Sequence, residues 1–154
     1  MARQSWDETW MAVAHTIARR SRCDRRQVGA VVVGPSNRIV STGYNGPPAG
    51  LRLDADTTCS AWCSRARTGV ETPSYDNCMT VHAEANALLY ADRRLYEGGT
   101  LYVTSMLCWD CSKMVANSGI GRVVVEVDMM RDAHRNPERS MIFMDECGLE
   151  VHVI

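Results

Sequence analysis

Two short groups of metal-ligand side chains open two predicted helices of this chain, and a strand is predicted between them. The first group is His82 and Glu84, and the second is Cys108 and Cys111. A helix, a strand and a second helix in this order favour a sheet with helices on its faces. One ion lying between the two helix starts would then take ligands from both.

The other patterns extend this alternation of helices and strands. Hydrophobic residues at helical spacing predict helices over 6–20, 83–93, 109–118 and 137–146. Short β-branched runs predict strands over 28–33, 38–42, 100–104, 122–127 and 151–154, of which the first two form an antiparallel hairpin. Residues 43–80 predict a long loop with one helical turn at 61–66, and such loops are usually functional or held in place. We expect an α/β fold that occupies residues 1–154 as a single domain.

Composition excludes several classes of protein. With 45% hydrophobic and 23% charged residues the chain can bury a core, and no apolar run approaches the roughly 20 residues of a membrane helix. Residues 1–10 do not resemble a signal peptide, so we expect a cytoplasmic protein. A net charge of -1 disfavours nucleic acid as a partner. The basic run 19–26 is either a solvated helix end or a place for one anionic group.

The chain has seven cysteines, an unusual number for a cytoplasmic protein of 154 residues. An odd count without a secretory signal argues against a disulfide framework. Because cytosolic thiols stay reduced and thiolates bind zinc well, the cysteines favour metal ligation.

Cys108 and Cys111 can direct both sulfurs at one ion about 2.3 Å away, and His82 can supply a third ligand from the neighbouring helix. The fourth position stays open for water, as in catalytic zinc sites, where the ion lowers the pKa of that water. Glu84 is near enough to take the water's proton and pass it to a leaving group. Alone, the cysteine pair also fits a structural zinc site or a redox pair, His82 a core or surface histidine, and Glu84 a first-turn glutamate. Their conjunction favours the catalytic zinc site.

Five segments resemble one family of zinc enzymes. They are Gln27–Val33, Ile39–Gly50, His82–Ala87, Thr100–Thr104 and Gly119–Val124. The zinc motifs are similar to the signature of the cytidine and deoxycytidylate deaminase superfamily, His-x-Glu followed by Pro-Cys-x-x-Cys. Within it, residues 43–50 resemble most closely the deoxycytidylate (dCMP) deaminase branch.

The resemblance implies a three-layer α/β/α fold around a mostly five-stranded mixed sheet and a hydrolase that converts dCMP to dUMP with release of ammonia. It implies that His82, Cys108 and Cys111 hold zinc, that hydroxide attacks C4 of cytosine, and that Glu84 carries protons from water to N3 and the departing amine. It further implies that the backbone of Ala83 contacts the base and that Asn45 hydrogen-bonds the sugar or base. Turn chemistry before Gly46 explains Asn45 equally well.

Two residues near the paired cysteines stand out against the family pattern. Leu107 stands where the family usually has proline, and Trp109 between the paired cysteines is bulky. Proline would stiffen the turn and remove a donor, so leucine makes the local backbone less predictable. Neither change removes a zinc ligand, so both bear on substrate identity more than on metal binding.

Four further cysteines suggest a second zinc. Some phage and bacterial members of the family carry a structural zinc in the regions that here contain Cys23, Cys59, Cys63 and Cys78. A four-thiolate site would close tetrahedrally and would order the long loop. The alternative is that some of them are free buried thiols, which pack as small hydrophobes. Cys147, near the end of the last helix, is expected in the core.

A phosphate monoester substrate needs cationic or amide donors. The arginines near the predicted loops are Arg22, Arg25, Arg26, Arg52, Arg65 and Arg67, and the sequence does not choose among them. Relatives in this branch are often homo-oligomers regulated by deoxynucleoside triphosphates such as dCTP and dTTP, which the resemblance makes the expected effectors.

Two competing functions remain at this point. One is the same chemistry on another cytosine substrate, namely a 5-modified dCMP, a nucleoside or a base in RNA. The other is a non-catalytic zinc scaffold, against which Glu84 counts because a scaffold needs no carboxylate beside an open coordination position.

Overall fold

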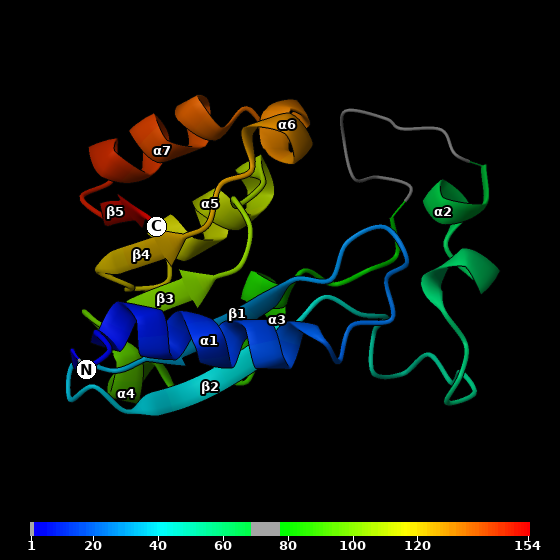
Figure 1. The fold of residues 1–154 in the computed structure, drawn as a ribbon, viewed down its shortest axis with the longest axis horizontal. Coiled ribbons are helices and arrows are strands. Elements are labelled where there is room, and N and C mark those ends of the chain that lie inside the picture. The colour runs from blue at the N-terminus through cyan, green and yellow to red at the C-terminus, as the bar shows by residue number, and fades with distance from the viewer. Residues whose placement is uncertain (1, 69–77) are drawn as a thin grey trace.

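The computed structural model describes residues 2–68 and 78–154. Its centre is a five-stranded mixed sheet of strand order β2-β1-β3-β4-β5 (Figure 1). The strands are β1 (Gly29–Val33), β2 (Ile39–Tyr44), β3 (Thr100–Val103), β4 (Arg122–Val125) and β5 (Glu150–Val153). β1 pairs antiparallel with β2 and β3, whereas β3, β4 and β5 run parallel. The predicted hairpin and the mixed sheet are therefore confirmed.

Helices cover both faces of the sheet, which gives three layers. The long helices are α1 (Trp6–Ala18), α3 (Ala83–Leu89), α5 (Trp109–Ala116) and α7 (Pro137–Glu146). Side chains alternate along each strand, so Val31 and Val33 pack with α1 on one face. Ala30 and Val32 pack with α3 and α5 on the other. The α/β/α architecture expected from the resemblance is confirmed, with α1 alone opposite α3, α5 and α7.

Local chemistry explains where α1 and α3 lie. Ser5 caps α1 by a capping box in which its hydroxyl accepts from Glu8 N and the Glu8 carboxylate accepts from Ser5 N. α3 packs directly on β2, because a Cβ at Gly43 would lie 2.2 Å from Ala83 O. This close approach sets the start of α3 against the sheet.

Some predicted boundaries were wrong. The helix predicted over 83–93 ends at Leu89, and Asp92 caps a separate helix, α4 (Arg93–Tyr96), by accepting from Arg94 N. The patterns missed α6 (Met129–Asp132) and the 3-10 turn η2 (Ala133–Arg135), which follow β4. These turns are too short to show hydrophobic periodicity.

The predicted long loop contains more helix than expected. It includes η1 (Cys59–Ala61) and α2 (Ser64–Thr68), and its part at 69–77 lies outside the described residues. In the described ranges, every helix is too short or too polar to cross a membrane.

Candidate metal centre and active site

The three predicted zinc ligands meet at two helix starts. His82 is the N-cap residue of α3, Cys108 is the N-cap residue of α5, and Cys111 lies in the first turn of α5. His82 Nδ1 lies 3.4 Å from each of the two sulfurs. A tetrahedral zinc at usual bond lengths would separate a nitrogen and a sulfur ligand by roughly 3.5 Å. The donor set and its spacing therefore fit zinc.

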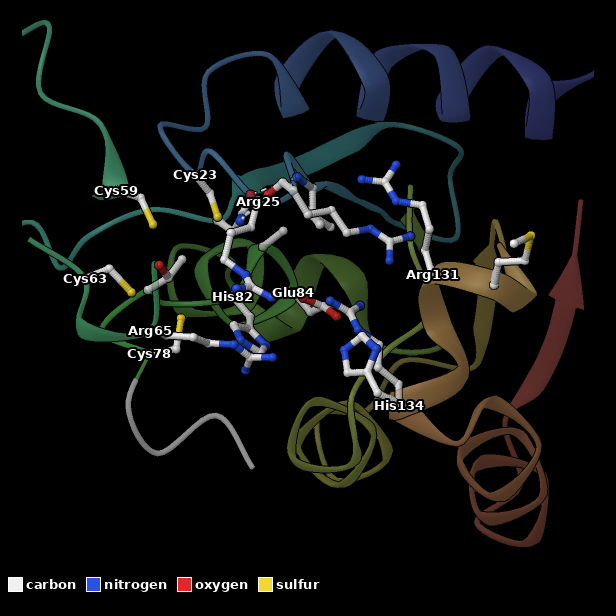
Figure 2. Close-up of a pocket in the computed structure, with 17 residues that line it drawn as sticks. Cys23, Arg25, Cys59, Cys63, Arg65, Cys78, His82, Glu84, Arg131 and His134 are labelled. Atoms are coloured by element: carbon white, nitrogen blue, oxygen red, sulfur yellow. Dashed lines mark hydrogen bonds between the residues drawn. The ribbon is translucent and has the colours of Figure 1, made fainter. Parts of the chain in front are cut away.

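Glu84 lies beside these ligands inside a cavity. It is 3% exposed, and Figure 2 shows it next to His82. The cavity has a volume of about 310 Å³, and His82, Ala83 and Glu84 all line it. Burial raises the pKa of the Glu84 carboxyl above its usual range. A buried carboxyl next to three ligand atoms has the position that a proton carrier needs.

Hydrogen bonds prepare one thiol of the pair for ligation. A bond from the Cys111 thiol and a weaker contribution from His82 lower the pKa of Cys108 to about 4, although burial opposes them. The same bond, together with burial, raises the pKa of Cys111. Cys108 is therefore the ligand that most readily supplies a thiolate.

Asn45 makes long-range hydrogen bonds in place of the local turn bonds that its position before Gly46 suggests. Its Oδ1 accepts from Val28 N at 2.8 Å, and its Nδ2 donates to Arg26 O at 2.8 Å. It is 7% exposed and lines the cavity. The side chain therefore ties the end of β2 to the segment that enters β1.

The four remaining cysteines of the predicted second site line the same cavity. Figure 2 shows the sulfurs of Cys23, Cys59, Cys63 and Cys78 turned toward a common space. Cys59 and Cys63 are each 1% exposed, and the backbone N of Cys59 donates to Arg22 O. Among the described residues, however, only His82, Cys108 and Cys111 place three ligand atoms within 4.8 Å of one another. The four cysteines are gathered, but more loosely.

The prediction that Cys147 belongs to the core is wrong. Cys147 is exposed, because it is the C-cap residue of α7 and lies beyond the last helical residue, Glu146, where the chain turns at Gly148.

Neither departure from the family pattern disturbs the ligands. Leu107 is fully buried in the core. The Trp109 ring packs on Phe143 with centroids 4.8 Å apart, and Arg139 lies over it at 3.9 Å. Trp109 therefore contacts α7 and does not line the cavity.

Arginines dominate the charge of the cavity wall. Of the six candidates from the sequence, Arg25, Arg26 and Arg65 line it, whereas Arg22, Arg52 and Arg67 do not. Sequence reasoning missed three more basic lining residues, Arg131, His134 and Arg135, which come from α6 and η2. The one local signal for α6 was Asp128, which caps it by accepting from Met130 N and Arg131 N. Glu84 is the only carboxylate among the described lining residues, so the cavity favours an anionic ligand.

Comparison with known proteins agrees with this chemistry. The model of the cytidine and deoxycytidylate deaminase zinc-binding region matches residues 4–127. The chain is 49% identical over 126 residues to a deoxycytidylate deaminase of Mycobacterium phage D29, with 80% of this chain and 96% of that protein covered. It is 38% identical over 133 residues to the Schizosaccharomyces pombe deoxycytidylate deaminase, with 86% of this chain but only 40% of the yeast protein covered.

Solved structures show the same fold. The dCMP deaminase of cyanophage S-TIM5 in apo form matches with a TM-score of 0.70 and 25% identity, covering 99% of this chain and 100% of that chain. The same enzyme in complex with dCMP and dUMP matches with a TM-score of 0.67 and 26% identity over 100% of both chains.

Proposed function

This chain belongs to the cytidine and deoxycytidylate deaminase family, and we propose that it hydrolyses dCMP to dUMP and ammonia with the residues described above. The observation that carries the assignment of residues is the meeting of His82, Cys108 and Cys111 beside the buried Glu84. The phage relative, which the chain covers almost completely, is a deoxycytidylate deaminase.

The residues of the site divide the chemical work among them. His82, Cys108 and Cys111 would hold a zinc ion, which when bound supplies a water of lowered pKa. Glu84 carries one proton of the attacking water to N3 of cytosine and the other to the amino group, which leaves as ammonia. The water oxygen first adds to C4, and the bond from C4 to the amino nitrogen then breaks, which leaves the carbonyl group of dUMP.

The position of the substrate follows from what lines the cavity. We propose that the backbone of Ala83 contacts the base. The Asn45 amide uses one hydrogen of Nδ2 and one lone pair of Oδ1 within the protein, and we propose that the remaining hydrogen or lone pair contacts the sugar or base. The phosphate would lie against the arginines. Within residues 2–68 and 78–154, the side chain of Arg131 makes no hydrogen bond or ion pair, so its guanidinium is available to an anion.

We also propose that Cys23, Cys59, Cys63 and Cys78 hold a second, structural zinc. Support comes from the common direction of their sulfurs and from the burial of Cys59 and Cys63 in a region with little core of its own (Figure 2). Four thiolates would close such a site tetrahedrally, and contraction of the four cysteines around the ion would order the loop.

Four broader expectations remain part of the proposal. We propose that the chain is a single deaminase-type domain, a cytoplasmic enzyme, a homo-oligomer, and a target of dCTP and dTTP. The free state of all seven cysteines supports the cytoplasmic location. Light scattering and initial rates with each triphosphate would test the oligomer and the effectors.

The decisive experiment measures ammonia release from dCMP, deoxycytidine and 5-methyl-dCMP side by side on protein of known zinc content. Activity on dCMP but not on deoxycytidine is the expected result, because the cationic wall recognises the phosphate. Equal activity on deoxycytidine would move the substrate class to nucleosides. The absence of ammonia with all three substrates would overturn the proposal and leave a base in RNA or the non-catalytic scaffold as the competing functions.

A further inference from the structure

The segment that presents Cys108 is held from outside by one arginine. Ser105, Met106 and Leu107 are fully buried between the end of β3 and the start of α5. Arg135 Nη1 donates to Ser105 Oγ at 2.7 Å and also to the carbonyl of Met106. The Arg135 side chain is only 11% exposed, so these are buried charge-assisted hydrogen bonds.

A fully buried carboxylate orients that arginine. Asp132 is 0% exposed, and its Oδ1 lies 3.9 Å from Arg135 Nε. The same carboxylate accepts hydrogen bonds from Nη1 and Nη2 of Arg26 and from the backbone N of Asp128. Asp132 therefore joins the turn that follows β4 to the segment that enters β1.

This network connects the two sides of the cavity. The carbonyl of Arg26 accepts from Asn45 Nδ2, and Asn45 accepts from the backbone N of Val28. Hydrogen bonds, together with the 3.9 Å ion pair of Asp132 and Arg135, thus connect Asn45, which lines the cavity, to the residue two places before Cys108. Buried networks of this kind are rigid only when every member is paired.

The position of the network matters because Leu107 precedes Cys108. Proline at this position would restrict φ and remove a donor, and leucine does neither. The Leu107 amide donates no hydrogen bond to any described residue, so nothing local replaces the missing restraint. Arg135 acts on the adjacent carbonyl of Met106 instead.

We propose that Arg135, oriented by Asp132, is a positioning residue that holds Cys108 in its ligating position and replaces the restraint that proline at 107 would provide. The inference rests on the proposed zinc site of His82, Cys108 and Cys111. Partners that orient metal ligands typically contribute 10- to 100-fold, in order of magnitude, to metal affinity. The role of Arg135 is therefore visible in the retention of zinc, without substrate.

The test follows zinc release to a chelator in the absence of nucleotide. Zinc should leave each site in a separate kinetic phase. The phase that belongs to the site of His82, Cys108 and Cys111 is the one that is missing in a Cys108→Ser variant. Arg135→Gln should accelerate that phase roughly 10- to 100-fold. Adding Leu107→Pro to Arg135→Gln should bring it back to within about threefold of the parent, because proline restores the restraint at the backbone. Arg131→Gln is the matched control, since Arg131 lies in the preceding helix α6 and its side chain makes no hydrogen bond to Met106, and its release rate should equal that of the parent.

An unchanged release phase in Arg135→Gln would overturn the proposal, and so would acceleration that Leu107→Pro does not reverse. If the double variant unfolds, Arg135→Met decides. Methionine fills part of the same space but has no hydrogen-bond donor, so release should be faster than in the parent, and release equal to the parent would refute the restraint. If the parent binds no zinc in the Cys108-dependent phase, the proposed function itself fails, which is a separate outcome.

Discussion

The two proposed zinc sites of this molecule are built on different supports. Cys108 and Cys111 lie in the first turn of a helix that packs on the sheet, and His82 caps a neighbouring helix on the same face. Cys23, Cys59, Cys63 and Cys78 come from loops and from the short turn η1. The ligand atoms of the first site lie within 4.8 Å of one another, whereas those of the second do not meet this limit. A core can therefore preform a metal site, whereas loops need the metal to complete one.

The pKa values of the thiols do not separate the two sites. Hydrogen bonding from Cys111 lowers the pKa of Cys108 to about 4, and the same bond raises the pKa of Cys111. At the second site, burial and then the neighbouring thiols raise the pKa of Cys59 to about 12, whereas at Cys63 burial is outweighed by backbone hydrogen bonds, which lower its pKa. Each site thus pairs a thiol of lowered pKa with one of raised pKa, and the spacing of the ligand atoms is what separates the two sites.

The largest expected effect separates chemistry from metal binding at the first site. Glu84→Gln should lower kcat for dCMP by about 10²- to 10⁴-fold, because the amide cannot carry a proton. The zinc content should stay equal to that of the parent, since Glu84 is not among the three clustered ligands. Ammonia release and metal analysis on one preparation check both. Glu138→Gln, an exposed change in the first turn of α7, is the control, and retained turnover in Glu84→Gln would remove its assigned role.

The next effect tests whether the second site is structural. Replacing both Cys59 and Cys63 by serine should remove one zinc per chain and lower Tm by about 10 °C or more, because the loop loses the proposed metal cross-link. Cys108→Ser should also remove one zinc but lower Tm less, since the core holds that region. Calorimetry with metal analysis makes the comparison, and Cys147→Ser is the control because Cys147 is exposed. Equal zinc content in the double variant and the parent would refute the second site.

A smaller effect concerns the arginine-rich wall of the cavity that both sites line. Arg131→Gln should raise KM for dCMP by roughly tenfold, because one charge-assisted contact to phosphate is lost. Initial rates over a range of dCMP concentrations measure it, and kcat should change little. Arg52→Gln is the control because Arg52 does not line the cavity. An unchanged KM would exclude Arg131 from phosphate binding.

The smallest effect concerns the scaffold that supports the first site. Arg122 holds the pKa of Asp7 down at about 2, against an ordinary value of 3.8. Because the folded pKa is the lower one, this pair stabilises the fold above about pH 4, and the contribution disappears as the pH falls toward 2.

Asp7→Asn should therefore lower the free energy of unfolding by about 1 to 2 kcal/mol at pH 7, and the unfolding free energies of the variant and the parent should converge near pH 2. Urea unfolding at several pH values measures the difference. Asp110→Asn, which alters an exposed pair with Lys113, should show no such convergence. A difference between Asp7→Asn and the parent that does not change with pH would contradict the assignment.

Much of the first site was predictable because its chemistry is local. Cys108 and Cys111 lie one helical turn apart, so sequence spacing alone directs both sulfurs to one side. His82 and Glu84 lie within three residues at the start of α3, so their motif is also local, and Gly148 marks the end of α7 with a φ of 85°. The cysteine excess likewise indicated metal before any motif was considered.

The remaining features depend on residues far apart in the chain. Asn45 looked like a turn residue but bonds to Val28 and to Arg26. Arg135 lies 29 positions from the carbonyl that it holds, and Arg26 lies 106 positions from Asp132. Cys147 is exposed because it lies at the C-cap of α7, beyond the last helical residue.

The sequence by itself determined the candidate ligands, the proposed proton carrier and the alternation that builds the sheet, because each of these is a pattern within a few residues. Only the tertiary structure decided which arginines face the cavity, how Leu107 is compensated, and how tightly the four loop cysteines gather. The physical reason is that short turns such as α6 and η2 span too few residues to show the hydrophobic periodicity from which helices are predicted. Their side chains acquire roles only when packing brings distant segments into contact.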